Sequence, residues 1–140
     1  MRELPDTLAG THQHEVTEAD AATRWRNDLP VLATPVLLWL GELAAMDALG
    51  SYLEDDEMTV GLSHDATHLA ATLVGEQVSL TAVLVQQRGN RLVFEVSGHD
   101  GVDEVLRGTH TRAVVSRSKF LARLAEKAEK TGTQPQPVSA

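Results

Sequence analysis

The chain has 140 residues, a net charge of -8 and no cysteine. This length predicts a single domain with its own core, and the lack of cysteine excludes disulfides, a thiol nucleophile and cysteine metal sites. The acidic charge, with only 12 basic residues, argues against a nucleic-acid partner but not against a phosphorylated ligand. The N-terminal residues lack the apolar segment of a secretory signal, so we expect a cytoplasmic protein.

The N-terminal part leads into one long apolar helix. Residues 11–17 partly alternate and predict a first short strand, while residues 18–29 are polar, carry Trp25, and predict a loop or short helix. Thr34 is expected to cap the long helix with its hydroxyl. Pro35 suits the first helical position, because its missing N–H costs nothing there. The helix should end near Gly50 or Tyr52.

The apolar helical segment is about 18 residues long, near the lower limit for a membrane-spanning helix. Glu42 and Asp47 lie within it, and no second such segment exists in the sequence. A helix that is apolar on all sides also suits the core of a globular protein. We therefore interpret this segment as a buried helix and expect no membrane association.

After the helix, the apolar residues alternate as in strands. Strands are predicted at residues 58–72, bent at Gly61, and at 77–86, 91–97 and 102–116. Residues 88–90 and 99–101 predict tight turns. Residues 119–130 predict an amphipathic terminal helix. We expect one domain over residues 1–130 and a disordered tail over residues 131–140.

This order of elements predicts an α+β architecture. A sheet with one apolar face must bury that face, and the apolar helix is the obvious partner. A long central helix wrapped by a five-stranded antiparallel sheet, with a short C-terminal helix, is the hotdog fold. A helix this apolar also suggests that a second subunit covers its far side.

Glu42 is unusual because it lies in the middle of the apolar helix. An isolated carboxylate is costly to bury, so such a group usually finds a partner, loses its charge or takes part in chemistry. Two interpretations follow. Either Glu42 pairs with a buried arginine or lies at an exposed gap in the helix, or it is a desolvated base or nucleophile. Asp47 lies nearer the end of the helix and is interpreted as ordinary.

The role of Thr34 is also open between structure and function. Helix capping is a sufficient reason for a Thr-Pro pair, but amides at a helix N-terminus can also polarise a carbonyl or hold an anion. Glu42 lies roughly 12 Å further along the helix axis, so direct contact within one helix is not expected. If both act on one substrate, the chain before the helix curls back, or the two residues come from different subunits.

Histidines supply further candidates. His64 and His68 would share a helix face, but in a strand they lie roughly 13 Å apart and no third ligand is well placed, so we expect no metal. His68 alone is an acid, a base or a donor, or else a half-buried strand residue. Gly61 allows close approach to a ligand or marks a bulge. His110 and Arg112 share a strand face and are interpreted as structural, with Arg112 also a candidate contact to a ligand phosphate.

A series of short motifs runs through the chain in order. They are Ala33-Thr34, Glu42, Tyr52-Leu-Glu54, Thr67-His68, Ala70-Ala-Thr72, Gly89-x-Arg91-Leu92, His99-Asp-Gly-Val-Asp-Glu104, Gly108-Thr-His110 and Arg112-Ala-Val114. With these motifs the chain resembles the fluoroacetyl-CoA thioesterase branch of the hotdog superfamily over nearly its full length, most closely from Ala33 to Phe120. The ordered, correctly spaced matches make the resemblance specific.

The resemblance implies a catalytic threonine, glutamate and histidine at Thr34, Glu42 and His68, with Gly61 near the acyl group. It also implies a homodimer, or a larger assembly, whose sites lie at the subunit interface and whose substrate is an acyl-CoA. The segment from Trp25 to Pro30 lacks the phenylalanine-rich lid associated with fluoroacetyl selectivity, and Trp25 is its only aromatic residue. The fluorinated substrate is therefore not implied.

The sequence thus predicts an acyl-CoA thioesterase that acts on a short or modified acyl group and needs no cofactor, because CoA is part of the substrate. Glu42 would attack the thioester or activate water, Thr34 would orient that carboxylate or the acyl group, and His68 would stabilise charge or protonate the thiolate. The alternatives are a hotdog protein that binds acyl-CoA or a small ligand without hydrolysis, and a hotdog dehydratase or hydratase. The second lacks a suitable histidine before or within the helix.

Overall fold

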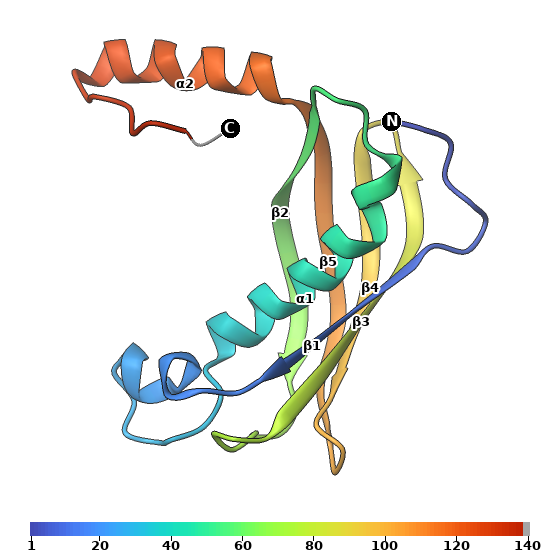
Figure 1. Cartoon of the computed structure of the whole chain (residues 1–140), viewed down its shortest axis with the longest axis vertical. Coiled ribbons are helices and arrows are strands. Elements are labelled where there is room, and N and C mark those ends of the chain that lie inside the picture. The colour runs from blue at the N-terminus through green and yellow to red at the C-terminus, as the bar shows by residue number, and fades with distance from the viewer. Residues whose placement is uncertain (139–140) are drawn as a thin grey trace.

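The computed structural model describes residues 1–138 and confirms the predicted α+β hotdog fold. Five antiparallel strands form one curled sheet in the order β1-β3-β4-β5-β2, and helix α1 lies across its inner face (Figure 1). The strands are β1 (Ala9–Glu15), β2 (Glu57–His68), β3 (Gln77–Arg88), β4 (Arg91–His99) and β5 (Glu104–Ser116). Strands β1 and β2 are therefore the two edges of the sheet.

Helix α1 (Thr34–Leu49) is followed by a 3-10 turn, η3 (Gly50–Tyr52), so its end matches the prediction. Its sheet-facing side is fully buried and includes Leu37, Leu40 and Leu49. On its other side Trp39 and Met46 are exposed, as expected of a helix that is apolar all round. Within residues 1–138, no helix is long and apolar enough to span a membrane.

Alternating side chains on the central strands build the core. Period-two alternation predicts seven inward residues, of which six are buried: Val78, Leu80, Ala82, Leu92, Phe94 and Val96. The seventh, Leu84, is partly buried against the core. The β3–β4 hairpin closes through a two-residue turn in which Gly89 has a φ of 56°, a conformation that favours glycine. The β4–β5 hairpin closes over residues 100–103, where Asp100 Oδ1 accepts hydrogen bonds from two backbone amides.

Some predicted boundaries were wrong. Strand β2 ends at His68 rather than near Thr72, because pairing with β5 stops there and the chain then pairs with the segment before α1. Leu32 N donates to Thr72 O at 2.9 Å in that second pairing. The polar N-terminal segment contains two 3-10 turns, η1 (Glu18–Asp20) and η2 (Ala22–Trp25). The ordered connections in this region hold the start of α1 beside the end of β2.

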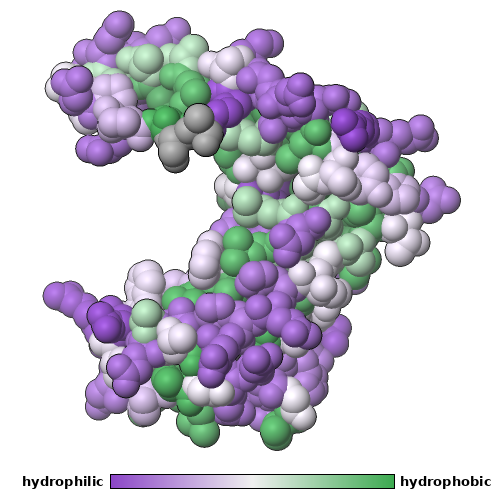
Figure 2. All heavy atoms as spheres, viewed as in Figure 1, coloured by the Kyte–Doolittle hydropathy of each residue, from purple (hydrophilic) through white to green (hydrophobic). Residues whose placement is uncertain are grey.

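Helix α2 (Arg117–Thr131) begins two residues earlier than predicted, with Ser116 as its N-cap. It projects from the end of β5, away from the body of the molecule (Figure 1). In the surface view a hollow opens between α2 and the opposite end of the molecule (Figure 2). Residues 133–138 carry no helix or strand, and residues 139–140 of the predicted tail lie outside the described residues.

The contact between β1 and α1 can be tested at Gly10. A methyl group there would overlap the Ala44 carbonyl oxygen and come within 2.6 Å of the Ala48 amide nitrogen. We expect Gly10→Ala to lower the free energy of unfolding by about 1–3 kcal/mol, because overpacking forces the helix away from the strand. Urea unfolding measures this change.

Gly50→Ala is the matched control for this substitution. A Cβ atom at Gly50 meets nothing within 4 Å, and its φ of -50° suits any residue. Gly50→Ala should be neutral or stabilise the protein by less than about 1 kcal/mol. If both variants unfold at the same urea concentration, α1 does not pack on β1 as closely as described.

Candidate active site

Thr34 and His68 form the first group of polar side chains, at the N-terminal end of α1. Thr34 Oγ1 lies 2.7 Å from His68 Nδ1, a short hydrogen bond between the start of the helix and the last residue of β2. The predicted capping role of Thr34 was wrong: Ala33 is the N-cap, and no side chain caps this end. The threonine hydroxyl is therefore committed to the imidazole and not to the helix.

The imidazole of His68 is half-buried, and its other nitrogen has no ordinary partner. Nε2 is inaccessible to solvent and makes no hydrogen bond of normal geometry with residues 1–138. Burial lowers the pKa of His68 below its ordinary value of 6.5, and a weak interaction with the Ala70 backbone opposes this shift only in part. His68 is therefore neutral near pH 7, with one nitrogen held by Thr34 and the other left free.

Glu42 belongs to a second group, around the middle of α1. Its Oε1 accepts a hydrogen bond from Arg112 Nη1 at 3.1 Å, and the two side chains are 26% and 4% exposed. The interpretation of Glu42 as the partner of a buried arginine is thus confirmed, and Glu42 is not isolated. Pairing satisfies the charge of both groups but does not remove the carboxylate from chemistry, because the contacts of this group involve Oε1 and not Oε2.

Arg112 is fixed on β5 by hydrogen bonds in several directions. Its Nε donates to Thr59 Oγ1 at 2.9 Å and its Nη2 donates to Thr59 O at 3.1 Å. Its Nη1 is shared between Glu42 Oε1 and His110 Nε2, each at 3.1 Å. With these donors engaged, the side chain presents a fixed positive charge to Glu42. A contact between Arg112 and a ligand phosphate stays a prediction.

Gly61 lies directly against the Glu42 carboxylate. A Cβ atom at this position would overlap Glu42 Oε1, and it would also come within 3.4 Å of Arg112 Nη1. The register between β2 and β5 shifts between Gly61 and Ser63, so the glycine also marks an irregularity of the strand. The interpretation of Gly61 as a bulge marker is confirmed, and its missing side chain gives the Glu42 carboxylate its space. Close approach of a ligand to Gly61 stays a prediction.

His64 and His110 complete the second group, and sequence analysis did not predict this pair. Their rings stack at 4.2 Å between centroids, and their Nε2 atoms lie 3.8 Å and 3.5 Å from Glu42 Oε1. The signal was indirect, because His64 pairs with His110 only in the β2–β5 register. One ligand atom from each of Glu42, His64 and His110 lies within 4.8 Å of the others, a spacing that suits a metal ion. The Arg112 guanidinium, however, already brings a positive charge to two of these atoms.

The chain does not bring its three predicted catalytic residues together. Thr34 meets His68, whereas Glu42 meets Arg112, roughly 12 Å further along the helix axis. Trp25, the remaining candidate, ends η2, and its side chain is 54% exposed. The chain thus holds two separate polar groups along the line where α1 meets β2.

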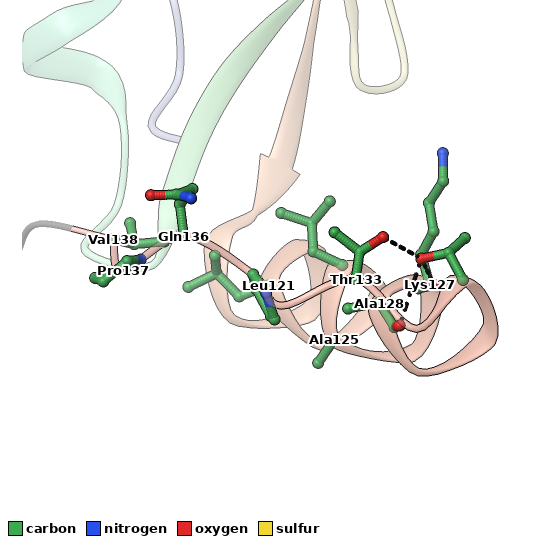
Figure 3. Close-up of a pocket in the computed structure, with 11 residues that line it drawn as sticks. Leu121, Ala125, Lys127, Ala128, Thr133, Gln136, Pro137 and Val138 are labelled. Carbon is green, nitrogen blue, oxygen red and sulfur yellow. Dashed lines mark hydrogen bonds between the residues drawn. The ribbon is translucent and has the colours of Figure 1, made fainter.

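A large apolar cavity of about 710 Å³ lies elsewhere, between α2 and the segment of residues 133–138 (Figure 3). Its lining includes Leu121, Ala125 and Val138, and Lys127 is its one titratable residue within the described chain. Apart from Lys127 and the hydroxyls of Thr131 and Thr133, this lining offers no nucleophile, acid or base. The chemistry therefore lies with the polar groups between α1 and β2.

Comparisons with known proteins agree with this geometry. The sequence profile of the fluoroacetyl-CoA-specific thioesterase family matches residues 16–118. The fluoroacetyl-CoA thioesterase of Streptantibioticus cattleyicolor is 44% identical over 97 residues, which cover 69% of this chain and 70% of that protein. A crystal structure of a fluoroacetyl-CoA thioesterase, 36% identical, matches with a TM-score of 0.82 over 89% of this chain and 98% of the other.

A more distant structure supports the fold alone. A hypothetical protein of Thermus thermophilus, a thioesterase superfamily member, matches with a TM-score of 0.88 over 94% of this chain and 98% of its own, at 24% identity.

The Arg112–Glu42 pair predicts a large cost for losing the arginine. Arg112→Met would leave the Glu42 charge and several buried acceptors without a donor, so we expect the free energy of unfolding to fall by about 2–4 kcal/mol. Arg107→Met is the control on the same strand, because Arg107 pairs with Glu104 at the surface. Its loss should cost less than about 1 kcal/mol. Chemical denaturation of both variants measures the difference, and equal effects would refute the buried pair.

The free energy of unfolding should fall as the pH drops below the ordinary pKa of histidine. Burial lowers the pKa values of His68 and His110 below 6.5. The unfolded chain therefore binds protons that the folded chain does not, so stability is full above about pH 6.5 and falls as the pH drops towards 5.

The slope of unfolding free energy against pH measures this effect. It should correspond to about one to two protons taken up on unfolding in this range. The slope, and not the absolute stability, should be smaller in His68→Gln. A slope that stays flat down to pH 5 would show that neither histidine is held neutral.

Proposed function

Because the chain belongs to the fluoroacetyl-CoA-specific thioesterase family, we propose that it hydrolyses a short or modified acyl-CoA thioester to the free acid and CoA. Membership confirms the predicted family and reaction class, thioester hydrolysis. The single observation that carries the proposal is the 2.7 Å hydrogen bond that joins the Thr34 hydroxyl to His68 at the start of the helix. A hydroxyl that is hydrogen-bonded to a neutral imidazole, and not used to cap the helix, is typical of a reactive pair.

Glu42 starts the reaction in this proposal. Its Oε2 atom either attacks the thioester carbonyl carbon, which gives a mixed anhydride that water then hydrolyses, or takes a proton from a water molecule that attacks this carbon. Arg112 holds Oε1 and thereby orients the carboxylate. The carbonyl oxygen becomes negatively charged as the new bond forms, and backbone amides, with that of Gly61 among them, stabilise this charge.

His68 completes the reaction at the departing sulfur. Thr34 donates its hydroxyl hydrogen to Nδ1, which fixes the imidazole tautomer that carries hydrogen on Nε2. As the carbon–sulfur bond breaks, the Nε2–H group donates a hydrogen bond to the departing sulfur, and CoA leaves as a thiolate that takes its proton from water. The buried, unpartnered state of Nε2 supports this role. Carboxylate, hydroxyl and imidazole suffice for the chemistry, so the proposal includes no metal or redox cofactor.

The proposed range of acyl groups is wider than fluoroacetyl alone. The segment from Trp25 to Pro30 carries one aromatic side chain, that of Trp25, where a phenylalanine-rich lid is associated with fluoroacetyl selectivity. Trp25 is mostly exposed and is proposed to cover the acyl end of the substrate. A panel of acetyl-, fluoroacetyl-, propionyl- and branched acyl-CoA substrates identifies the preferred group.

A homodimer would bring the Thr34–His68 pair of one copy to the Glu42–Arg112 pair of the other. Strand β2 is an edge strand that can pair with its own copy, and Thr34 is exposed. Antiparallel pairing about an axis between His64 and Asp65 would place His68 of one copy opposite Gly61 of the other. Since Gly61 touches Glu42, Glu42 of one copy would then face Thr34 and His68 of the second copy. A second copy would also cover the exposed side of α1.

Substitution of the carboxylate and the imidazole tests the mechanism. We expect Glu42→Gln and His68→Ala each to lower kcat by about 100-fold or more, because the first removes the base or nucleophile and the second removes the group that stabilises the departing sulfur. Thiol release across the acyl-CoA panel measures kcat, and direct binding of acyl-CoA should persist. A wild-type protein that binds acyl-CoA but releases no thiol from any substrate would favour the non-hydrolytic alternative.

Mixing the two inactive variants tests whether the site crosses the interface. Joint refolding of Glu42→Gln and His68→Ala gives mixed dimers. In each of these, one site contains both an intact Glu42 and an intact His68, and the other site contains neither. About a quarter of wild-type activity should return at equal amounts of the variants, since half of the dimers are mixed and each has one working site. If the residues act within one chain, no activity returns.

A further inference from the structure

Of the three charged or titratable side chains that lie against Glu42, that of His110 is the most completely buried. Its side chain has no solvent exposure, and it lies on β5 two residues before Arg112. Nδ1 is 2.9 Å from the carbonyl oxygen of Ser63 on β2. A carbonyl oxygen only accepts hydrogen bonds, so Nδ1 carries the hydrogen and donates it.

The other ring nitrogen must then be the acceptor. Nε2 lies 3.1 Å from Arg112 Nη1, and a guanidinium only donates. These two contacts are satisfied together by one species alone, the neutral imidazole with its hydrogen on Nδ1. A charged imidazolium, or the opposite tautomer, would point an N–H group at the N–H group of Arg112.

The groups that face His110 agree with a neutral ring. Burial lowers its pKa, and the charges of His64 on β2 and Arg112 on β5 act in the same direction. The Ser63 carbonyl and the Glu42 carboxylate on α1 oppose this shift. Stacking of the His64 ring at 4.2 Å shields the His110 ring further from water.

We propose that His110 is a positioning residue that acts through Arg112 to hold the Glu42 carboxylate in its working orientation. Thr59 binds Nε and Nη2 of Arg112, and His110 binds Nη1, the nitrogen that also binds Glu42 Oε1. With Oε1 held in this way, Oε2 is the oxygen that faces the reaction. The effect on catalysis rests on the proposed thioesterase function, whereas the state of the ring does not.

The ring state can be measured in the wild-type protein without any substrate. Long-range ¹H–¹⁵N correlation spectra distinguish the two neutral tautomers and the charged imidazolium. At pH 7 we expect the pattern of a neutral ring with hydrogen on Nδ1, unchanged down to pH values below those at which an exposed histidine titrates. A charged ring or the Nε2–H tautomer at pH 7 overturns the proposal, whether or not the protein is an enzyme.

Two substitutions then separate positioning from simple packing. The amide oxygen of Gln reaches the place of Nε2 and can accept from Arg112, whereas the shorter Asn can replace only the donor to Ser63. We expect His110→Asn to lower kcat by about 10-fold with KM changed less than about twofold, and His110→Gln to recover most of that loss. His12→Asn, the same change at the surface of β1, should leave kcat unchanged.

The outcomes distinguish this inference from the proposed function. If the wild type hydrolyses acyl-CoA and His110→Asn matches its kcat, the positioning role is wrong and the thioesterase stands. If Asn and Gln reduce kcat equally, His110 serves packing alone and the proposal fails. If the wild type releases no thiol, the thioesterase proposal fails, and the tautomer spectrum still decides whether His110 holds Arg112.

Discussion

The ion pair between Glu42 and Arg112 is the constraint on which the rest of this structure depends. A carboxylate in an apolar helix is tolerable only with a cation in reach, and the cation itself must be held in place. Arg112 meets this need because β5 delivers it under the middle of α1, where it also binds Thr59. This contact therefore ties the middle of α1 to β5 at the site.

The ion pair in turn requires an irregular β2. Glu42 has room for its carboxylate only because Gly61 lacks a side chain, and the register shift between Gly61 and Ser63 lies at the same point. After that shift, the Ser63 carbonyl lies within hydrogen-bond reach of His110. A bulge, a glycine and a buried imidazole thus serve one purpose, which is to fix a single oxygen of Glu42.

Sequence analysis predicted the features that depend on local pattern. Alternation located the central strands, the glycine at position 89 marked the hairpin turn, and the charge within an apolar helix identified Glu42. It missed what depends on register. His64 and His110 are far apart in the chain and meet only through β2–β5 pairing, and no local pattern reports that pairing.

The same limit explains the error at the start of α1 and leads to the question of assembly. A threonine before a proline predicts a cap, and only tertiary contact with His68 shows that its hydroxyl is used elsewhere. That contact places a complete hydroxyl–imidazole pair at one end of the helix, with the carboxylate held at its middle. Both positions are fixed by strong local contacts, so a conformational change within one chain would have to break the ion pair or the short hydrogen bond to unite them. Pairing of β2 with its own copy would unite them without breaking either contact, and this is the argument for the proposed dimer over a conformational change within one chain.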